Sequence, residues 1–117
     1  MTRICLALDL VDDAALIAEY ERWHRVGNTD PAVTQSIRDA GIDNMEIYRA
    51  GTRLFMIIDA NERYSPEAKA QADAANPAVV AWVAKMRRMQ QPIPAAGPEG
   101  SWHPMDRIFR LTDHEGR

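Results

Sequence analysis

A phenol and an imidazole, Tyr20 and His24, stand four residues apart in the segment EYERWH. Side chains at this spacing lie next to each other on one face of a helix. Leu16, one turn before Tyr20, is apolar and indicates that this face turns inward. Because an imidazole has an unperturbed pKa of about 6.5, a buried His24 could move protons near neutral pH. The alternative is a histidine at the edge of the core that only satisfies a backbone carbonyl.

Trp82 is a candidate for binding a ligand rather than for catalysis. It lies in an apolar helical stripe with Val79 and Val83, where a tryptophan is usually part of the core. A flat indole can also line a small-molecule pocket, for example against the C–H face of a sugar. Trp102, with His103 beside it, falls in a loop rich in proline and glycine and could cover such a pocket.

Motifs for other chemistries are missing from the sequence. The three histidines, His24, His103 and His114, are far apart, and none has metal-ligand spacing. No glycine-rich phosphate loop is present. Cys5 has no neighbouring base in the sequence and is interpreted as a small core residue rather than a nucleophile. The sequence therefore gives no sign of metal, phosphate or covalent chemistry.

The composition is that of one globular domain. The chain has 117 residues, 46% of them hydrophobic and 26% charged, so we expect a single domain over residues 1–117. Its net charge of −3 disfavours nucleic acid as a partner, since binding phosphates needs a clustered basic excess.

Neither a membrane segment nor a signal peptide is expected. The longest apolar run, Ala78–Ala84, has seven residues, against about 20 for a membrane span. Asp9, Asp12 and Asp13 interrupt the N-terminus where the apolar part of a signal peptide would continue. A single cysteine, which cannot form an internal disulfide, fits a reducing compartment. These features predict a cytoplasmic protein without a membrane partner.

The elements that must position these side chains follow from periodicity and capping residues. Alternating or continuous apolar residues predict strands over residues 3–9, 42–49, 53–60 and 105–111. Helix starts are indicated by Asp12 or Asp13, Asp30-Pro31, Ser65-Pro66 and Asn76-Pro77. Gly41 is expected to end the second of these helices.

This order, β-α-β-β-α-β, predicts an α+β, ferredoxin-like fold, with a four-stranded antiparallel sheet and helices packed on one face. Leu54–Ile58 is apolar throughout, which is typical of a central strand covered on both faces. The helices can cover only one face. We therefore expect a homodimer, in which a second copy covers the other.

Several segments together resemble a known family. They are ICLALDL, EYERWH, IRDAGIDNMEIYRAGTRLFMI, DAANPAVVAWVAKM, QQPIP and SWHPMDRIFRL. This combination resembles the L-rhamnose mutarotase family over residues 3–111. It is most similar to the branch associated with L-fucose utilisation.

The resemblance implies an isomerase that interconverts the α and β anomers of a 6-deoxy-L-hexose without a metal or organic cofactor. It also implies a dimeric α/β barrel that holds the sugar between the helices and the sheet. His24 matches the family's proton-donating histidine, and Tyr20 matches a substrate-contacting tyrosine. Trp82 matches the first of two adjacent aromatic residues that line the pocket.

Some positions depart from the rhamnose enzymes. Their second pocket tryptophan corresponds to Val83, and a substrate-binding tyrosine on the second strand corresponds to Met45. A thioether cannot donate the hydrogen bond that a phenol gives, and methionine at this place is expected in the fucose-type branch. The segment after His24, RVGNTDP, also lacks the family's aromatic-proline pair. We therefore expect L-fucose as the sugar, with L-rhamnose as the alternative.

Two other classes of function remain open at this point. The same fold hosts cofactor-free monooxygenase-like enzymes and ligand-binding proteins, and a sugar-sensing module is a non-enzymatic alternative. Only a mutarotase exchanges magnetisation between the two anomeric protons of a sugar without forming a new product.

Overall fold

Strand β1 (Thr2–Leu10) lies inside the sheet and pairs along both of its edges. The computed structural model describes residues 1–114, and over that range the sheet has five strands, all paired antiparallel. Their order is β2-β3-β1-β4, and β5 also pairs with β1. The predicted ferredoxin-like arrangement of strands and helices is confirmed.

Strands β2 (Ile42–Ala50) and β3 (Arg53–Ala60) form the predicted hairpin. Gly51 in the turn has a φ of +61°, a conformation that glycine adopts without strain. On its other edge β3 pairs with β1 over eight residue pairs, from Thr2 opposite Ala60 to Asp9 opposite Arg53. The strand is therefore central, as the apolar run in the sequence predicted.

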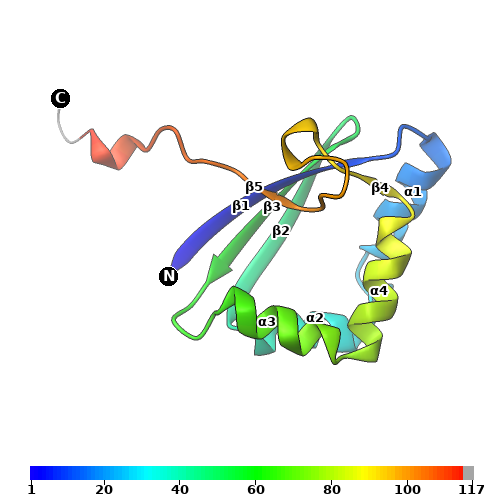
Figure 1. Cartoon of the computed structure of the whole chain (residues 1–117), viewed down its shortest axis with the longest axis horizontal. Coiled ribbons are helices and arrows are strands. Elements are labelled where there is room, and N and C mark those ends of the chain that lie inside the picture. Colours follow the sequence, from blue (N-terminus) through cyan, green and yellow to red (C-terminus); the bar gives the residue numbers. More distant parts are fainter. Residues whose placement is uncertain (115–117) are drawn as a thin grey trace.

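Four α-helices cover one face of the sheet in the described chain, as Figure 1 shows. They are α1 (Ala14–Trp23), α2 (Pro31–Asp39), α3 (Pro66–Ala74) and α4 (Pro77–Arg87). Each begins after a polar side chain that accepts a hydrogen bond from a first-turn N–H. These caps are Asp13, Asp30, Ser65 and Asn76. Within residues 1–114, no helix has the length and apolar character to cross a bilayer.

Two buried clusters fill the space between helices and sheet. The first contains Leu8, Leu10, Tyr20, Leu54, Met86 and Met89. The second contains Ile42, Met56, Ile58 and Ala60. Two partly buried side chains, Ile47 and Trp102, pack against both clusters and so lie where they meet. On the opposite face of β3, Phe55 and Ile57 are only half-buried, so this chain alone does not provide the predicted cover on both faces.

The predicted closing strand over residues 105–111 is wrong. The free edge of β1 pairs instead with two short strands, β4 (Gln90–Gln91) and β5 (His103–Pro104). Residues 105–110 have no regular structure, and Figure 1 shows this segment running away from the sheet.

The register of β5 gives a physical reason for this departure. Leu6 lies opposite Pro104, so a continued ladder would set Ile4 opposite Asp106 and Arg3 opposite Arg107. Like charges facing each other destabilise a strand pair. The alternating pattern of residues 105–111 is typical of a strand, but it carries no information about the charges on the neighbouring strand.

Gly41, after α2, packs closely against the segment that follows β3. Its φ is +93°, and an added Cβ would lie 2.8 Å from both Asn61 Oδ1 and the Tyr64 nitrogen. Gly41→Ala should lower the free energy of unfolding by about 2 kcal/mol or more, because a steric clash adds to backbone strain of roughly 1–2 kcal/mol. Urea denaturation followed by circular dichroism measures the loss.

Gly27→Ala is the matched control. Gly27 has a similar φ of +90°, but nothing lies within 4 Å of its added Cβ. Gly27→Ala should lose only the backbone strain, roughly 1–2 kcal/mol, and therefore less than Gly41→Ala. Equal losses in the two variants would show that the contacts around Gly41 relax without a penalty.

Candidate active site

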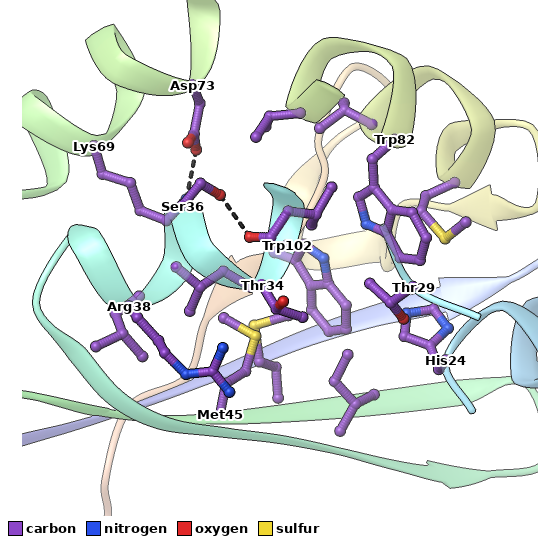
Figure 2. Close-up of a pocket in the computed structure, with 18 of the residues that line it drawn as sticks. His24, Thr29, Thr34, Ser36, Arg38, Met45, Lys69, Asp73, Trp82 and Trp102 are labelled. Atoms are coloured by element: carbon purple, nitrogen blue, oxygen red, sulfur yellow. Dashed lines mark hydrogen bonds and ion pairs between the residues drawn. The ribbon is translucent and has the colours of Figure 1, made fainter. Parts of the chain in front are cut away.

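A cavity of about 510 Å³ opens between the helices and the sheet, and Figure 2 shows side chains that line it. Its walls come from α1, α2, α3, α4 and β2, from Met56 of β3, and from Thr29, Gln90 and Trp102. Pockets for small molecules typically have volumes of about 300–1,000 Å³. The cavity is therefore of a suitable size for a small organic ligand.

His24 occupies the end of α1. The helix ends at Trp23, and the backbone N–H of His24 bonds the Glu21 carbonyl at 3.1 Å. The side chain of His24 bonds the carbonyl one residue earlier. Its Nδ1 lies 2.6 Å from the backbone carbonyl oxygen of Tyr20. A carbonyl can only accept, so Nδ1 carries the proton and donates it. His24 thus satisfies a backbone carbonyl, as the simpler sequence interpretation predicted, but this uses only one ring nitrogen.

The second nitrogen of His24, Nε2, keeps a lone pair in the neutral ring. The side chain lines the cavity. Burial lowers the pKa of His24 below its usual value, and the hydrogen bond to the Tyr20 carbonyl partly offsets that effect. The neutral imidazole therefore predominates at pH 7, and Nε2 is available as a proton acceptor.

The phenol of Tyr20 lies beside this imidazole, with ring centroids 4.4 Å apart. Tyr20 is buried, and its hydroxyl oxygen accepts a hydrogen bond from Gln90 Nε2 at 3.2 Å. Burial raises the pKa of Tyr20, with the bond from Gln90 acting in the opposite direction. The hydroxyl therefore stays protonated near neutral pH and can donate to a ligand.

Trp82 of α4 meets His24 edge to face, with ring centroids 5.3 Å apart. Contacts behind the cavity hold this wall in place. The Lys85 Nζ lies 3.5 Å from the ring centroid of Trp23 and 5.4 Å from that of Trp82, within the range of cation–π attraction. Trp23 Nε1 donates in turn to Glu19. These contacts fix α1 and α4, and hence His24 and Trp82, against each other.

The end of the cavity along α2 and α3 is polar. Lys69 and Asp73 of α3 form an ion pair, and both side chains are mostly shielded from solvent. Ser36 of α2 lines the same end. Figure 2 shows these three side chains across the cavity from His24 and Trp82. The cavity thus has an acid–base end with aromatic walls and a second end that offers hydrogen-bonding groups.

The structure brings all five site residues predicted from the sequence to this one cavity. They are Tyr20, His24, Met45, Trp82 and Val83. Met45 is half-buried on β2. Val83 is 41% exposed, which places it at the rim.

Sequence reasoning missed several lining residues. Gln90 begins the segment QQPIP, but nothing in that segment assigns it to the site, and the Lys69–Asp73 spacing is that of an ordinary surface pair on a helix. Trp102 reaches the cavity, whereas its neighbour His103 pairs with Ala7 in the sheet. Among residues 1–114, no three His, Cys, Asp or Glu side chains gather in a group suited to a metal ion.

Comparison with known proteins identifies the family. Residues 3–111 match the model of L-rhamnose mutarotase. The chain belongs to the L-rhamnose mutarotase family. The resemblance seen in the sequence is confirmed, and with it the enzyme class, a carbohydrate isomerase of the mutarotase type.

Individual relatives extend over most of the chain. An L-fucose mutarotase of Xanthomonas campestris pv. campestris is 48% identical over 113 residues, which cover 97% of this chain and 90% of the relative. A UPF0734 protein of Dictyostelium discoideum is 36% identical over 110 residues, or 90% of this chain and 86% of the relative. The crystal structure of an L-rhamnose mutarotase from Formosa agariphila has a TM-score of 0.64 at 19% identity, covering 94% of this chain and 98% of that one. The last comparison shows that the fold is shared.

The buried environment of His24 predicts its titration. Its pKa in the folded mutarotase should lie below the value of about 6.5 measured for an exposed histidine, because burial disfavours the imidazolium. Well above pH 6.5 the imidazole is neutral in both the folded and the unfolded chain, so its titration does not change the free energy of unfolding. As the pH falls further, the unfolded chain takes up the proton first, so the free energy of unfolding decreases until the folded-state pKa is passed.

An NMR titration of the His24 ring protons measures this pKa, with the urea-unfolded chain as the reference. A folded-state pKa at or above the unfolded value would contradict the prediction.

Proposed function

We propose that this mutarotase interconverts the α and β anomers of a 6-deoxy-L-hexose, with L-fucose as its preferred substrate. The observation that carries the proposal is the orientation of His24. Its Nδ1 is held by the Tyr20 carbonyl, which leaves Nε2 as a base at the wall of a cavity. The 48% identity to an L-fucose mutarotase supports the choice of sugar.

The proposed reaction moves one proton between two oxygens of the sugar. Nε2 of His24 takes the proton of the anomeric hydroxyl, O1, as a general base. The electron pair of the breaking C1–O5 bond goes to O5, and C1 becomes an aldehyde. Because O1 and O5 are both bonded to C1, the imidazolium can deliver the same proton to O5. The number of protons on the enzyme is unchanged after ring opening.

Rotation about the C1–C2 bond then exposes the other face of the aldehyde. The same steps in reverse close the ring to the other anomer, so His24 is in turn proton acceptor and proton donor. The Tyr20 hydroxyl, kept protonated by its burial, donates a hydrogen bond to the oxygen on which negative charge develops. Gln90 orients that hydroxyl.

The energetic demand suits a small scaffold. Positioned proton transfer contributes about 10²–10⁴-fold in rate, which corresponds to roughly 3–5 kcal/mol of activation free energy. Mutarotation already proceeds slowly in water, so a larger contribution is not required.

Three further side chains give the pocket its proposed sugar preference. Trp82 offers a flat apolar wall to the C–H face of the pyranose. Met45 and Val83 line the cavity without donating hydrogen bonds, unlike the phenol and indole expected at these places in a rhamnose-specific pocket. This difference supports L-fucose over L-rhamnose.

Replacement of His24 tests the mechanism. Glutamine retains size and hydrogen bonding but cannot change its charge, so His24→Gln should fold and lose about 10²-fold or more of the enzyme-dependent anomer exchange. NMR saturation transfer between the anomeric protons of L-fucose measures the rate. Exchange by the parent should decline as the pH falls through the pKa of His24, because the imidazolium cannot accept a proton.

His114→Gln is the matched control, because His114 stacks on Phe109 in the C-terminal segment. It should exchange anomers like the parent. A folded His24→Gln variant that keeps more than about a third of parental exchange would remove His24 from the mechanism, since that loss is under 1 kcal/mol of barrier.

The proposal includes a homodimer formed through the open face of the sheet. The strand register sets Tyr48, Phe55 and Ala7 in one row across that face, and Tyr48 is 56% exposed. The apolar middle lies between two ion pairs, Arg53–Asp9 and Arg3–Asp59. A second copy would bury this surface, which the helices of its own chain cannot reach.

Light scattering at micromolar concentration should give about twice the chain mass of 13.2 kDa. Phe55→Glu should shift the protein toward the monomer, because it places an unpaired carboxylate in the apolar contact. Val80→Glu is the control, since Val80 is exposed on α4, on the helical side of the molecule. A parent chain that remains monomeric would contradict the dimer.

A further inference from the structure

Trp102 reaches the cavity from a loop whose two ends both pair with β1. Before the loop, β4 pairs with Asp9 and Leu10, and after it β5 pairs with Leu6 and Ala7. The loop is therefore anchored twice on the strand that organises the sheet.

The backbone of this loop is closely packed just before Trp102. The Gly100 N–H donates to the Gly97 carbonyl at 3.1 Å. A Cβ at Gly100 would lie 2.5 Å from the Cβ of Ala96, so only glycine fits. Ile93, near the start of the loop, is buried. These contacts define where Trp102 is presented.

The indole of Trp102 forms part of an apolar wall beside the acid–base end of the cavity. It packs against both core clusters, and Figure 2 shows it between Met45 and His24. Ile47 and Met56 line the cavity with it. A ligand atom directly on this wall meets the carbon and sulfur of Trp102, Met45, Ile47 and Met56, with Thr34 and Arg38 of α2 beside it. The end formed by Ser36, Lys69 and Asp73 offers an ammonium, a carboxylate and a hydroxyl.

A 6-deoxy-L-hexose has the same asymmetry. It carries hydroxyl groups on C1 to C4 and a methyl group, C6, on C5. C5 is bonded to O5, one of the two oxygens on which His24 is proposed to act. The methyl group is therefore close to the acid–base pair, while the hydroxyls of C2 to C4 can extend toward Ser36, Lys69 and Asp73.

We infer that Trp102, together with Met45, is a specificity-determining residue that receives the C6 methyl group and disfavours a hydroxymethyl group. The inference rests on the proposed function and names a determinant of its substrate class. A hydroxyl buried against an indole face and a thioether has no strong hydrogen-bond partner. Apolar pockets reject an added hydroxyl by up to about 10²-fold, which sets the size of the expected preference.

L-Fucose and L-galactose make the matched substrate pair, because they differ only in the hydroxyl on C6. Saturation transfer between anomeric protons gives kcat and KM for each. The parent should prefer L-fucose by about 10–10²-fold in kcat/KM. Trp102→Gln should reduce that preference at least about fivefold by raising KM for L-fucose, with kcat within about threefold of the parent, since uniform binding is lost and the proton-transfer groups remain.

Two conservative variants complete the comparison. Trp102→Phe keeps an apolar wall and should retain most of the preference for L-fucose. If Trp102 acted through its indole N–H or only through loop structure, phenylalanine would not restore that preference. Trp23→Phe alters a tryptophan that packs behind the cavity against Lys85. Because Trp23 supports His24 and Trp82, this variant should change the rate with both sugars alike and leave the preference between them unchanged. A folded Trp102→Gln variant with the parental preference overturns the inference.

A binding measurement on the parent sequence tests the contact without kinetics. The chain has three tryptophans, so labelling with 5-fluorotryptophan gives three ¹⁹F signals, assigned by the single Trp→Phe variants. Saturating L-fucose should shift the Trp102 signal and leave the Trp23 signal in place. An unmoved Trp102 signal overturns the inference while leaving the proposed function standing. Absence of anomer exchange by the parent with both sugars overturns the proposed function, and the role of Trp102 with it.

Discussion

The hydrogen bond from Nδ1 of His24 to the Tyr20 carbonyl links the end of a helix to the chemistry of the cavity. In a continuing helix that carbonyl would accept from the backbone N–H of His24. Here the N–H bonds Glu21 instead, so the imidazole satisfies the carbonyl and is fixed in one tautomer. The position at which α1 stops therefore decides which ring nitrogen faces a ligand, and Asn28 and Thr29 support this ending by donating to the neighbouring carbonyls of Arg22 and Trp23.

Strand β1 joins this site to the rest of the fold. Its inner face supplies Leu8 and Leu10 to the cluster that also contains Tyr20, and its free edge anchors the loop that carries Trp102. Strand β1 thus packs against Tyr20 through its buried side chains and anchors the loop of Trp102 through its edge. Tyr20 and His24, the proposed reactive groups, both lie at the end of α1, and the sheet is the frame against which they are positioned.

Features that depend on neighbouring residues could be predicted from the sequence. A cap such as Asp30 acts on an N–H two residues away, and the spacing of Tyr20 and His24 alone places both on one face of α1. Features that depend on distant partners could not. Residues 105–111 alternate as a strand should, yet whether they pair with β1 depends on Arg3, which a continued ladder would set opposite Arg107. Likewise, Gln90 contributes to the site only because the fold brings it to a phenol 70 residues earlier in the chain.

The two ion pairs on the open face of the sheet repeat one spacing. Arg3 and Asp9 on β1 stand as far apart as Arg53 and Asp59 on β3, and the antiparallel register matches each arginine with an aspartate. A half-turn about an axis normal to the middle of this strand pair therefore exchanges the two ion pairs. Since these four charges compensate each other within one chain, they add little long-range attraction or repulsion toward any docking surface. Dissolved salt acts on contacts by screening such forces, so in the proposed dimer it would have little effect on these four groups. The shape of the apolar rows between them would then set the orientation of the second copy.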